Sequence, residues 1–260
     1  MKIFPTISKS FKSILIAIAL LTGSNAYAAF VPADILWVID TSGSMGQDID
    51  QIRTRIGQFN TEMTNNGIAA SYGLVEFGGN VGGSGIHQRI VTDMTDFLTF
   101  QTGLNSITAN HANPEDGSVA GLLGLNNITW TNGSVKNIIL VTDEDDDSDG
   151  GGGAATCVLR ANCNAFHNAL TAENALFNVI RNPNDGNTSL TYDFLAGAHG
   201  GTAFNILSFR SDPESFFDSF IATKVEEIKN VPQVPVPAAV WLFGTAMIGL
   251  FGFNKRRKAA

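Results

Sequence analysis

"VIDTSGSMG", residues 38–46, follows the apolar residues 35–37 and places Asp40, Ser42 and Ser44 at alternate positions. Together with Val38 and Ile39 the apolar run is continuous, which is typical of a strand buried on both faces of a parallel sheet. Ligands of such sheets bind at the carboxyl ends of the strands. The stretch therefore predicts a buried strand that leads into a ligand-binding loop with three oxygen side chains.

Strand-like and helix-like segments alternate from residue 33 onward. Apolar runs predict strands over residues 34–39, 70–77, 88–92, 137–141, 176–180 and 203–206. Helical patterns of apolar residues predict helices over residues 48–63, 97–107, 117–125, 164–174, 190–198 and 213–228. This alternation predicts an α/β fold with a doubly wound, mostly parallel central sheet of six strands that is flanked by helices.

The first 28 residues have the features of a secretory signal peptide. Three lysines precede the apolar run at residues 14–21, and Ala26-Tyr27-Ala28 supplies the small-x-small pattern of a cleavage site. The run is shorter than the ~20 residues of a membrane-spanning helix, although an uncleaved N-terminal anchor is the alternative. We therefore expect export through the Sec pathway and a domain over residues 29–230.

Residues 231–260 contain VPVP at 234–237, an apolar stretch at 238–253 and a basic cluster at 255–258. The apolar stretch can just cross a bilayer, and the basic cluster should stay cytoplasmic. This layout resembles the PEP-CTERM sorting signals that exosortases recognise in Gram-negative bacteria, with Val236 in place of the glutamate. The resemblance implies an exosortase-like partner and a final place at the cell surface or in the extracellular matrix. A permanent single-helix membrane anchor is the alternative.

The domain between these two ends is strongly acidic. Residues 29–230 contain 24 acidic and 9 basic side chains, which corresponds to a formal net charge of −15. Such a surface repels nucleic acid and attracts cations. We therefore exclude nucleic acid as a partner.

Two further polar segments are expected near Asp40. One is the loop NHANPEDG, residues 110–117, just before a predicted helix, and the other is Asp143, just after the strand at 137–141. Parallel strands bring such segments to one edge of the sheet. Because a hard divalent cation needs several oxygen ligands that converge from more than one segment, these segments predict a metal site.

"DTSGS" after one apolar strand and "VTD" after a later one resemble a von Willebrand factor A domain with its metal-ion-dependent adhesion site. The resemblance extends over residues 33–229 and includes LAGAHGGTAFNI at 195–206. It implies four metal ligands: Asp40, Ser42, Ser44 and Asp143. For the middle segment it implies Glu115, because NPEDG is similar to the proline–glutamate version of integrin β subunits. Thr108 is the alternative, because the commonest version of this segment uses a threonine.

The resemblance implies binding and no enzymatic reaction. Neutral hydroxyl ligands leave one position of a Mg²⁺ ion, or of Mn²⁺ or Ca²⁺, open for an acidic group of a partner. We therefore expect an exported, surface-associated adhesion module that binds a protein or an extracellular-matrix ligand. One alternative is a structural component of a polysaccharide or biofilm matrix, in which the metal only stabilises the fold. An exported hydrolase is the other.

Other interpretations of DTSGS account for less of the sequence. A serine–glycine turn with a helix N-cap leaves Asp143 unexplained. Ser42 stands where an aspartic protease needs glycine and where a haloacid-dehalogenase-type phosphatase needs a second aspartate. Neither Ser42 nor Ser44 fits the Gly-x-Ser-x-Gly pattern of a serine nucleophile.

An acidic, glycine-rich stretch, residues 144–153, follows Asp143 directly. Asp145, Asp147 and Asp149 fit the first half of a calcium loop, and Thr156 at its twelfth position excludes a full EF-hand. The stretch predicts a weak Ca²⁺ site, with a solvated acidic loop as the alternative.

Cys157 and Cys163 are the two cysteines of the chain, and in an exported protein they are expected to form a disulfide. On an unbroken helix they would lie ~9 Å apart along the axis, which is too far for a bond. The segment is therefore either a loop with a disulfide or a helix with unpaired thiols, and we favour the loop.

Overall fold

The structure is a computed structural model that describes residues 30–80, 86–147, 156–185 and 187–232. The predicted signal peptide, the apolar stretch at 238–253 and the basic cluster at 255–258 lie outside these ranges. None of the helices within them combines the length and the hydropathy that a membrane crossing requires.

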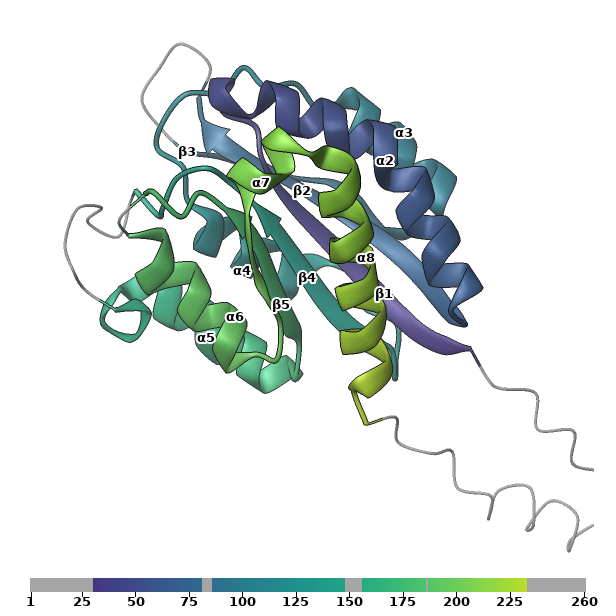
Figure 1. The fold of residues 1–260 in the computed structure, drawn as a ribbon. Coiled ribbons are helices and arrows are strands. Elements are labelled where there is room, and N and C mark those ends of the chain that lie inside the picture. The colour runs from purple at the N-terminus through teal and green to yellow at the C-terminus, as the bar shows by residue number, and fades with distance from the viewer. Residues whose placement is uncertain (1–29, 81–85, 148–155, 186, 233–260) are drawn as a thin grey trace, which may run out of the picture. The chain divides into compact units, whose positions relative to one another are not determined.

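In the described part of the chain, six strands form one sheet in the order β3-β2-β1-β4-β5-β6 (Figure 1). Neighbouring strands are parallel except β2 and β3, which are antiparallel. The strands are β1 (Val31–Asp40), β2 (Ile68–Gly79), β3 (Ile86–Thr95), β4 (Val135–Val141), β5 (Leu176–Arg181) and β6 (Ala203–Asn205). The predicted α/β fold with a mostly parallel six-stranded sheet is therefore confirmed.

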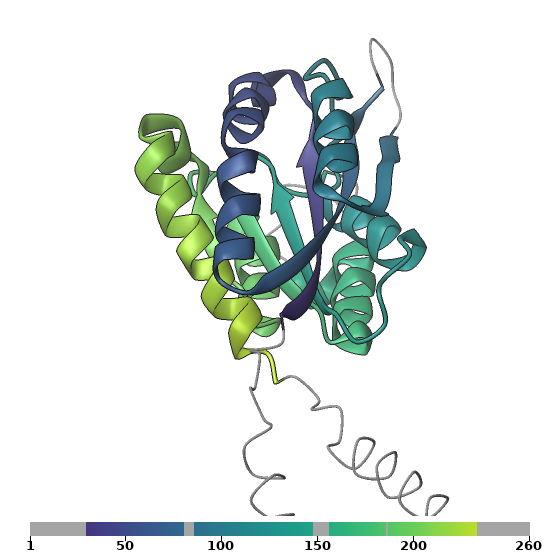
Figure 2. The same cartoon turned by 90° about the vertical axis from the view of Figure 1, so that its right-hand side faces the viewer.

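Helices cover both faces of this sheet (Figure 2). Apolar side chains of α2, α3, α7 and α8 pack on one face, and those of α4, α5 and α6 pack on the other. The helices are α2 (Gly46–Asn65), α3 (Phe97–Ser106), α4 (Gly117–Asn127), α5 (Ala161–Glu173), α6 (Phe194–Ala198), α7 (Ile206–Ser211) and α8 (Pro213–Asn230).

Strand β1 lies between β2 and β4 and contributes to both cores. Trp37 and Ile39 pack in the core with α2 and α8, whereas Leu36 and Val38 pack in the core with α4 and α5. All four side chains have zero exposure. Side chains alternate between the two faces of a strand, so a strand covered on both faces is apolar at every position. The continuous apolar run has this physical cause.

One predicted boundary is wrong in an informative way. The strand expected over residues 203–206 ends at Asn205, and Ile206 begins the short helix α7. The side chain of Asn205 accepts a hydrogen bond from the backbone N–H of Leu207 at 2.8 Å, which caps the new helix. Burial of Ile206 and Phe209 then anchors α7 against the core.

The chain approaches itself very closely in the turn before β6. A Cβ atom added at Gly201 would lie 1.9 Å from the backbone oxygen of Phe177, whereas one added at Gly197 in α6 would meet no atom within 4 Å. The LAGAHGGTAFNI stretch therefore needs glycine at position 201 for backbone packing against β5.

These two glycines make a matched pair for a stability test. We predict that Gly201→Ala lowers the free energy of unfolding by at least about 2 kcal/mol, because backbone must move to relieve the overlap. Gly197→Ala should raise it by about 0.5–1 kcal/mol, since alanine restricts the unfolded chain. Urea unfolding followed by circular dichroism measures both, and equal midpoints for the two variants would contradict the prediction.

Candidate metal centre

Three carboxylates from separate segments meet at the carboxyl edge of the sheet. Asp40 is the last residue of β1, Glu115 lies just before α4, and Asp143 follows β4. One oxygen of each lies within 4.8 Å of the others. Strands β1 and β4 are adjacent and parallel, so their carboxyl ends bring Asp40 and Asp143 together. Because a divalent cation bonds oxygen at about 2.0–2.6 Å, this cluster could hold one metal ion.

The Asp40 carboxylate is buried and held in place by two neutral donors. The backbone N–H of Ser42 donates to Oδ1 at 2.7 Å, and the hydroxyl of Thr142 donates to Oδ2 at 2.9 Å. Thr142 lies just before Asp143, so the second bond joins the loops that follow β1 and β4. The first residue of the DTSGS loop is therefore fixed in orientation.

The two serines of this loop turn toward the carboxylates. The hydroxyl oxygens of Ser42 and Ser44 lie 3.0 Å apart, and the hydroxyl of Ser44 donates to Oδ1 of Asp143 at 2.9 Å. Thr41 between Asp40 and Ser42 points elsewhere, with its hydroxyl donating to the backbone oxygen of Phe77 at 2.8 Å. The side chains at alternate positions of the loop therefore lie together, and their role as metal ligands stays a prediction.

Of the two alternatives for the middle segment, the structure places Glu115 in the carboxylate cluster. Thr108 is exposed, and its hydroxyl donates to Oδ1 of Asn110 at 3.2 Å. Oxygen Oε2 of Glu115 is buried and makes no hydrogen bond within the described structure. A buried carboxylate oxygen without a partner is costly, and a cation would satisfy it. The residues present thus fit a divalent metal ion.

The electrostatics of the cluster point the same way. Burial raises the pKa of Asp40 to about 6. Burial, followed by the nearby charge of Asp40, raises the pKa of Glu115 to about 10. Protons therefore occupy the cluster when it holds no cation, because several carboxylates cannot all be ionised at this separation. A divalent ion would displace these protons.

Arg210 is a member of the site that the sequence analysis missed. It lies in α7, and its Nε donates to both oxygens of Asp48, at 3.1 and 3.0 Å. Its terminal nitrogen donates to Oδ2 of Asp143 at 2.9 Å. These hydrogen bonds raise the pKa of Arg210 further above its ordinary value. Arg210 belongs to no recognisable sequence motif, and the helix α7 that carries it was not predicted.

The segment after Asp143 turns partly inward. Oδ2 of Asp145 lies 3.6 Å from the guanidinium of Arg160, and Oδ2 of Asp147 accepts the backbone N–H of Glu115 at 3.0 Å. Asp149, the third residue of the predicted calcium loop, lies outside the described ranges. Asp147 therefore bonds a group of the protein, whereas Oδ2 of Asp145 has an ion-pair contact and no hydrogen bond, and Ca²⁺ binding there stays a prediction.

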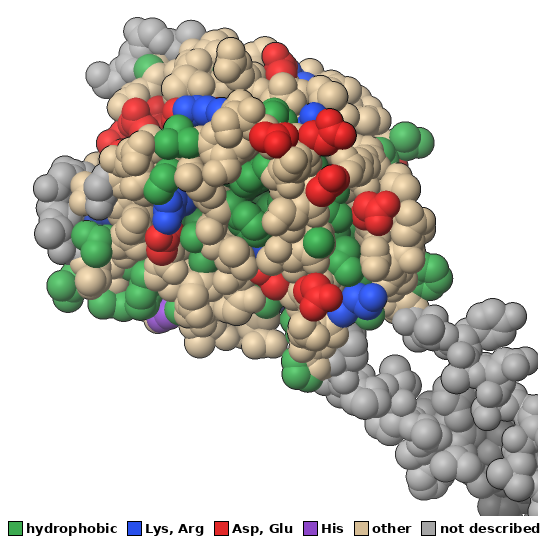
Figure 3. All heavy atoms as spheres, viewed as in Figure 1, with side chains coloured by type: hydrophobic (Ala, Val, Ile, Leu, Met, Phe, Trp, Pro, Cys, Tyr) green, Lys and Arg blue, Asp and Glu red, His purple; other side chains and the backbone are tan. Residues whose placement is uncertain are grey.

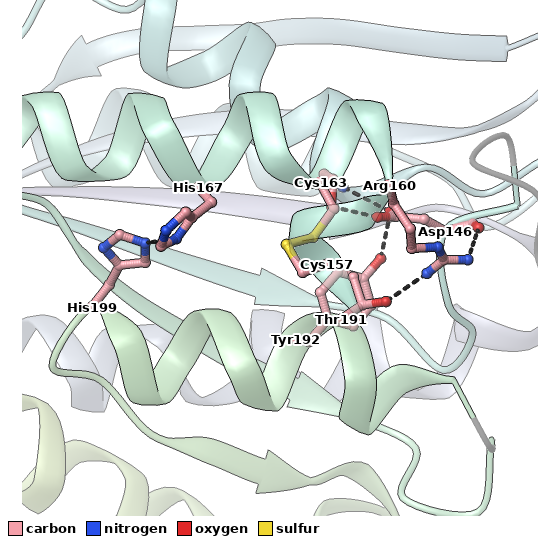
Figure 4. The surroundings of a disulfide bond; sticks show 9 residues. Asp146, Cys157, Arg160, Cys163, His167, Thr191, Tyr192 and His199 are labelled. Carbon is pink, nitrogen blue, oxygen red and sulfur yellow. Dashed lines mark hydrogen bonds between the residues drawn. A yellow bond between two sulfur atoms is a disulfide. The ribbon is translucent and has the colours of Figure 1, made fainter. Parts of the chain in front are cut away.

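Cys157 and Cys163 form a disulfide (Figure 4). Cys157 begins a 3₁₀ turn that ends at Leu159, and α5 begins only at Ala161. The break between turn and helix brings the two Cα atoms to 5.1 Å. This is the looped alternative of the two that the spacing left open.

The metal cluster can be tested through its protonation. Between the ordinary pKa of 3.8 and its value of about 6 in the folded protein, Asp40 binds more protons in the folded than in the unfolded state. Relative to Asp40→Asn, the metal-free protein should therefore lose about 3 kcal/mol of unfolding free energy as the pH rises from about 3 to about 7. Mg²⁺ at a hundredfold excess over its Kd should restore about 2.7 kcal/mol at pH 8 in the wild type only.

Urea unfolding in metal-free and MgCl₂ buffers across this pH range measures both effects. Asn keeps an oxygen for the Ser42 N–H, so the variant is expected to fold. Stability that rises with pH relative to Asp40→Asn would contradict the prediction, as would an equal response of both proteins to Mg²⁺.

Comparisons with known proteins add no assignment to this geometry. A scan against protein-family models found no model that matches the chain. A search of curated protein sequences likewise found no significant match.

Proposed function

We propose that this chain is an exported, surface-associated module that binds an acidic group of a protein or matrix partner through a divalent cation. The observation that supports it most is the cluster of Asp40, Glu115 and Asp143 with its unsatisfied buried oxygen. The fold is the α/β arrangement expected of a von Willebrand factor A domain. We therefore extend the resemblance to the function of that family's adhesion site.

The proposed ion is Mg²⁺, with Mn²⁺ or Ca²⁺ as substitutes, because every ligand is a hard oxygen. The ligands would be Asp40, Ser42, Ser44, Glu115 and Asp143. Bound there, the ion supplies a Lewis-acidic position for one further oxygen. Gly43 and Ser44 are exposed, so a partner reaches the cluster from the side of this loop.

The charge of the domain explains why such a partner would need the cation. Residues 29–230 carry a formal net charge of −15. In the view of Figure 3, acidic side chains lie on the surface over the region of α2 and α8. An acidic partner is repelled by this surface, and only a bridging cation makes the contact favourable. Binding should therefore be lost in chelator.

The arrangement of the domain suits display from a membrane or a matrix. The start of β1 and the end of α8 lie at the same end of the domain, opposite the carboxyl ends of the strands (Figures 1 and 2). The proposed signal peptide precedes β1 in the chain, and the proposed sorting signal follows α8. A module tethered there holds its metal cluster away from the tether.

A second candidate is a structural role in which the metal only stabilises the fold. Arg210 favours it, since this side chain already neutralises Asp48 and part of Asp143 from within the protein. In that case the ion would join the loops that follow β1 and β4 to the segment before α4, and no partner would be needed. An exported hydrolase is a weaker proposal, which turnover of an ester, peptide or glycan would support.

Substitutions at the cluster separate these candidates. We predict that Asp40→Ala and Asp143→Ala lower binding to cell-surface material of the native host at least about tenfold, since each removes a charged ligand. Ser42→Ala should weaken binding less, because it removes a neutral ligand. Chelator should reproduce the loss in the wild type, and Mg²⁺ or Mn²⁺ should reverse it. Asp218→Ala, an exposed carboxylate of α8, is the control and should bind normally.

A pull-down with fluorescently labelled protein measures this binding, and circular dichroism checks the fold of each variant. Folded Asp40→Ala that binds at full strength in chelator would contradict adhesion through the metal. Metal that raises the unfolding temperature without affecting binding would favour the structural role.

The proposed processing has its own test. We predict a mature N-terminus at Ala29 and loss of the chain beyond the VPVP segment at 234–237 after sorting. The intact mass of the protein from its native host measures both ends. A product that keeps the basic cluster at 255–258 would leave only the permanent anchor.

A further inference from the structure

Arg160 is a buried cation that the proposed site does not use. Its side chain is only 2% exposed. One terminal nitrogen donates to the hydroxyl of Thr191 at 2.6 Å, and the other donates to the backbone oxygen of Asp146 at 3.2 Å (Figure 4). The second nitrogen also lies 3.6 Å from Oδ2 of Asp145. A buried charge is stable only with such partners, so these contacts fix the position of the Arg160 side chain and of the groups that it contacts.

Two of the residues that Arg160 contacts, Asp145 and Asp146, belong to the segment that begins at Asp143. Asp147, next to Asp146, makes two hydrogen bonds with the backbone of Glu115. Its carboxylate accepts the backbone N–H of Glu115 at 3.0 Å, and its own backbone N–H donates to the backbone oxygen of Glu115 at 3.1 Å. Asp143 begins the same segment. Residues 143–147 therefore connect two of the three carboxylates of the cluster.

Asp146 ties this segment to the helix that follows Glu115. Its buried carboxylate accepts hydrogen bonds from the backbone N–H of Ser118 at 2.9 Å and from the hydroxyl of Tyr192 at 2.8 Å. The hydroxyl of Ser118 donates to its other oxygen. Ser118 lies in the first turn of α4, where backbone N–H groups lack helical partners. Glu115 is therefore fixed both by Asp147 and through the start of α4.

The disulfide holds Arg160 itself. Cys157 and Cys163 stand three residues before and three residues after Arg160, and both are fully buried. The N–H of Arg160 donates to the oxygen of Cys157 at 3.0 Å, and its own oxygen accepts the N–H of Asn164 at 2.9 Å. The bond between the cysteines closes this short segment, so the backbone from which the guanidinium extends is fixed on both sides.

We propose that Arg160, fixed by the Cys157–Cys163 disulfide, is a positioning residue for the metal centre. It contacts Asp145 and Asp146, and through the adjacent Asp147 this segment holds Glu115 and Asp143 at the separation that one cation requires. This inference rests on the proposed function, since it concerns the same metal cluster. It assigns the disulfide a role in metal affinity beyond the stability of α5.

The test measures Mn²⁺ binding by the purified full chain, from the electron paramagnetic resonance signal of free Mn²⁺. Arg160→Met keeps the bulk of the side chain and removes its charge and donors, and it should raise the Kd for Mn²⁺ about 10- to 100-fold. Arg160→Lys keeps the charge and should restore part of the affinity. The double variant Cys157→Ala/Cys163→Ala should raise the Kd in the same direction.

Ile228→Ala is the matched control. Ile228 is fully buried in the last turn of α8, and this end of α8 lies opposite the carboxyl ends of the strands (Figure 1). Its truncation lowers the urea midpoint through the core, and the Kd for Mn²⁺ should stay that of the wild type. A loss of affinity in this control equal to that of Arg160→Met would overturn the positioning role, because general destabilisation would then explain both.

The two proposals fail in different ways. Wild-type protein that binds no Mn²⁺ overturns the proposed function and this inference with it. Wild-type binding that Asp40→Ala abolishes, together with an unchanged Kd in Arg160→Met, overturns the inference alone. Should Arg160→Met not fold, Arg160→Lys decides, since its Kd must then lie above that of the wild type, and an unchanged value overturns the inference.

Discussion

The buried carboxylate of Asp40 is the constraint on which the described site depends. It ends the central strand β1 inside the protein, and its two hydrogen bonds, from the N–H of Ser42 and the hydroxyl of Thr142, join the loops after β1 and β4. The same carboxylate lies close to Glu115 and Asp143. An anion buried beside two others is unfavourable without a positive charge. Asp40 thus joins the two loops through its hydrogen bonds, and its buried carboxylate favours a cation in the cluster.

Arg210 supplies one positive charge beside these carboxylates, and the cluster could hold a metal ion as a second. Arg210 pairs with Asp48 and with one oxygen of Asp143, at the outer side of the cluster. The carboxyl groups of Asp40 and Glu115 are more fully buried, and Oε2 of Glu115 has no hydrogen bond within the described residues. A guanidinium is planar and needs room for five donors, whereas a divalent ion is compact. The inner position therefore suits a metal ion.

Two further buried ionisable residues, Asp146 and Arg160, fix the segments that carry the cluster. The carboxylate of Asp146 accepts a hydrogen bond from Ser118 at the start of α4. Arg160 donates to Thr191 in the π-helical turn Ser189–Asp193 and to the backbone oxygen of Asp146. Burial raises the pKa of Asp146 to about 6. Such networks are rigid when every member is satisfied. The acidic stretch after Asp143 is thus partly an internal scaffold, although its composition alone suggests a solvated loop.

The sequence by itself determined the fold class, the central strand and the alternate spacing of Asp40, Ser42 and Ser44, because these follow from local periodicity and from the meeting of parallel strand ends. It also pointed to Glu115 and Asp143, with Thr108 left open. The partners Arg210, Asp48 and Arg160 were decided only by the tertiary structure. These side chains come from segments far apart in the chain, and no local spacing records which buried charges pair across the core. Likewise, only the tertiary structure places Glu115 beside Asp40 and leaves Thr108 exposed, since the packing of separate segments determines which side chain is buried.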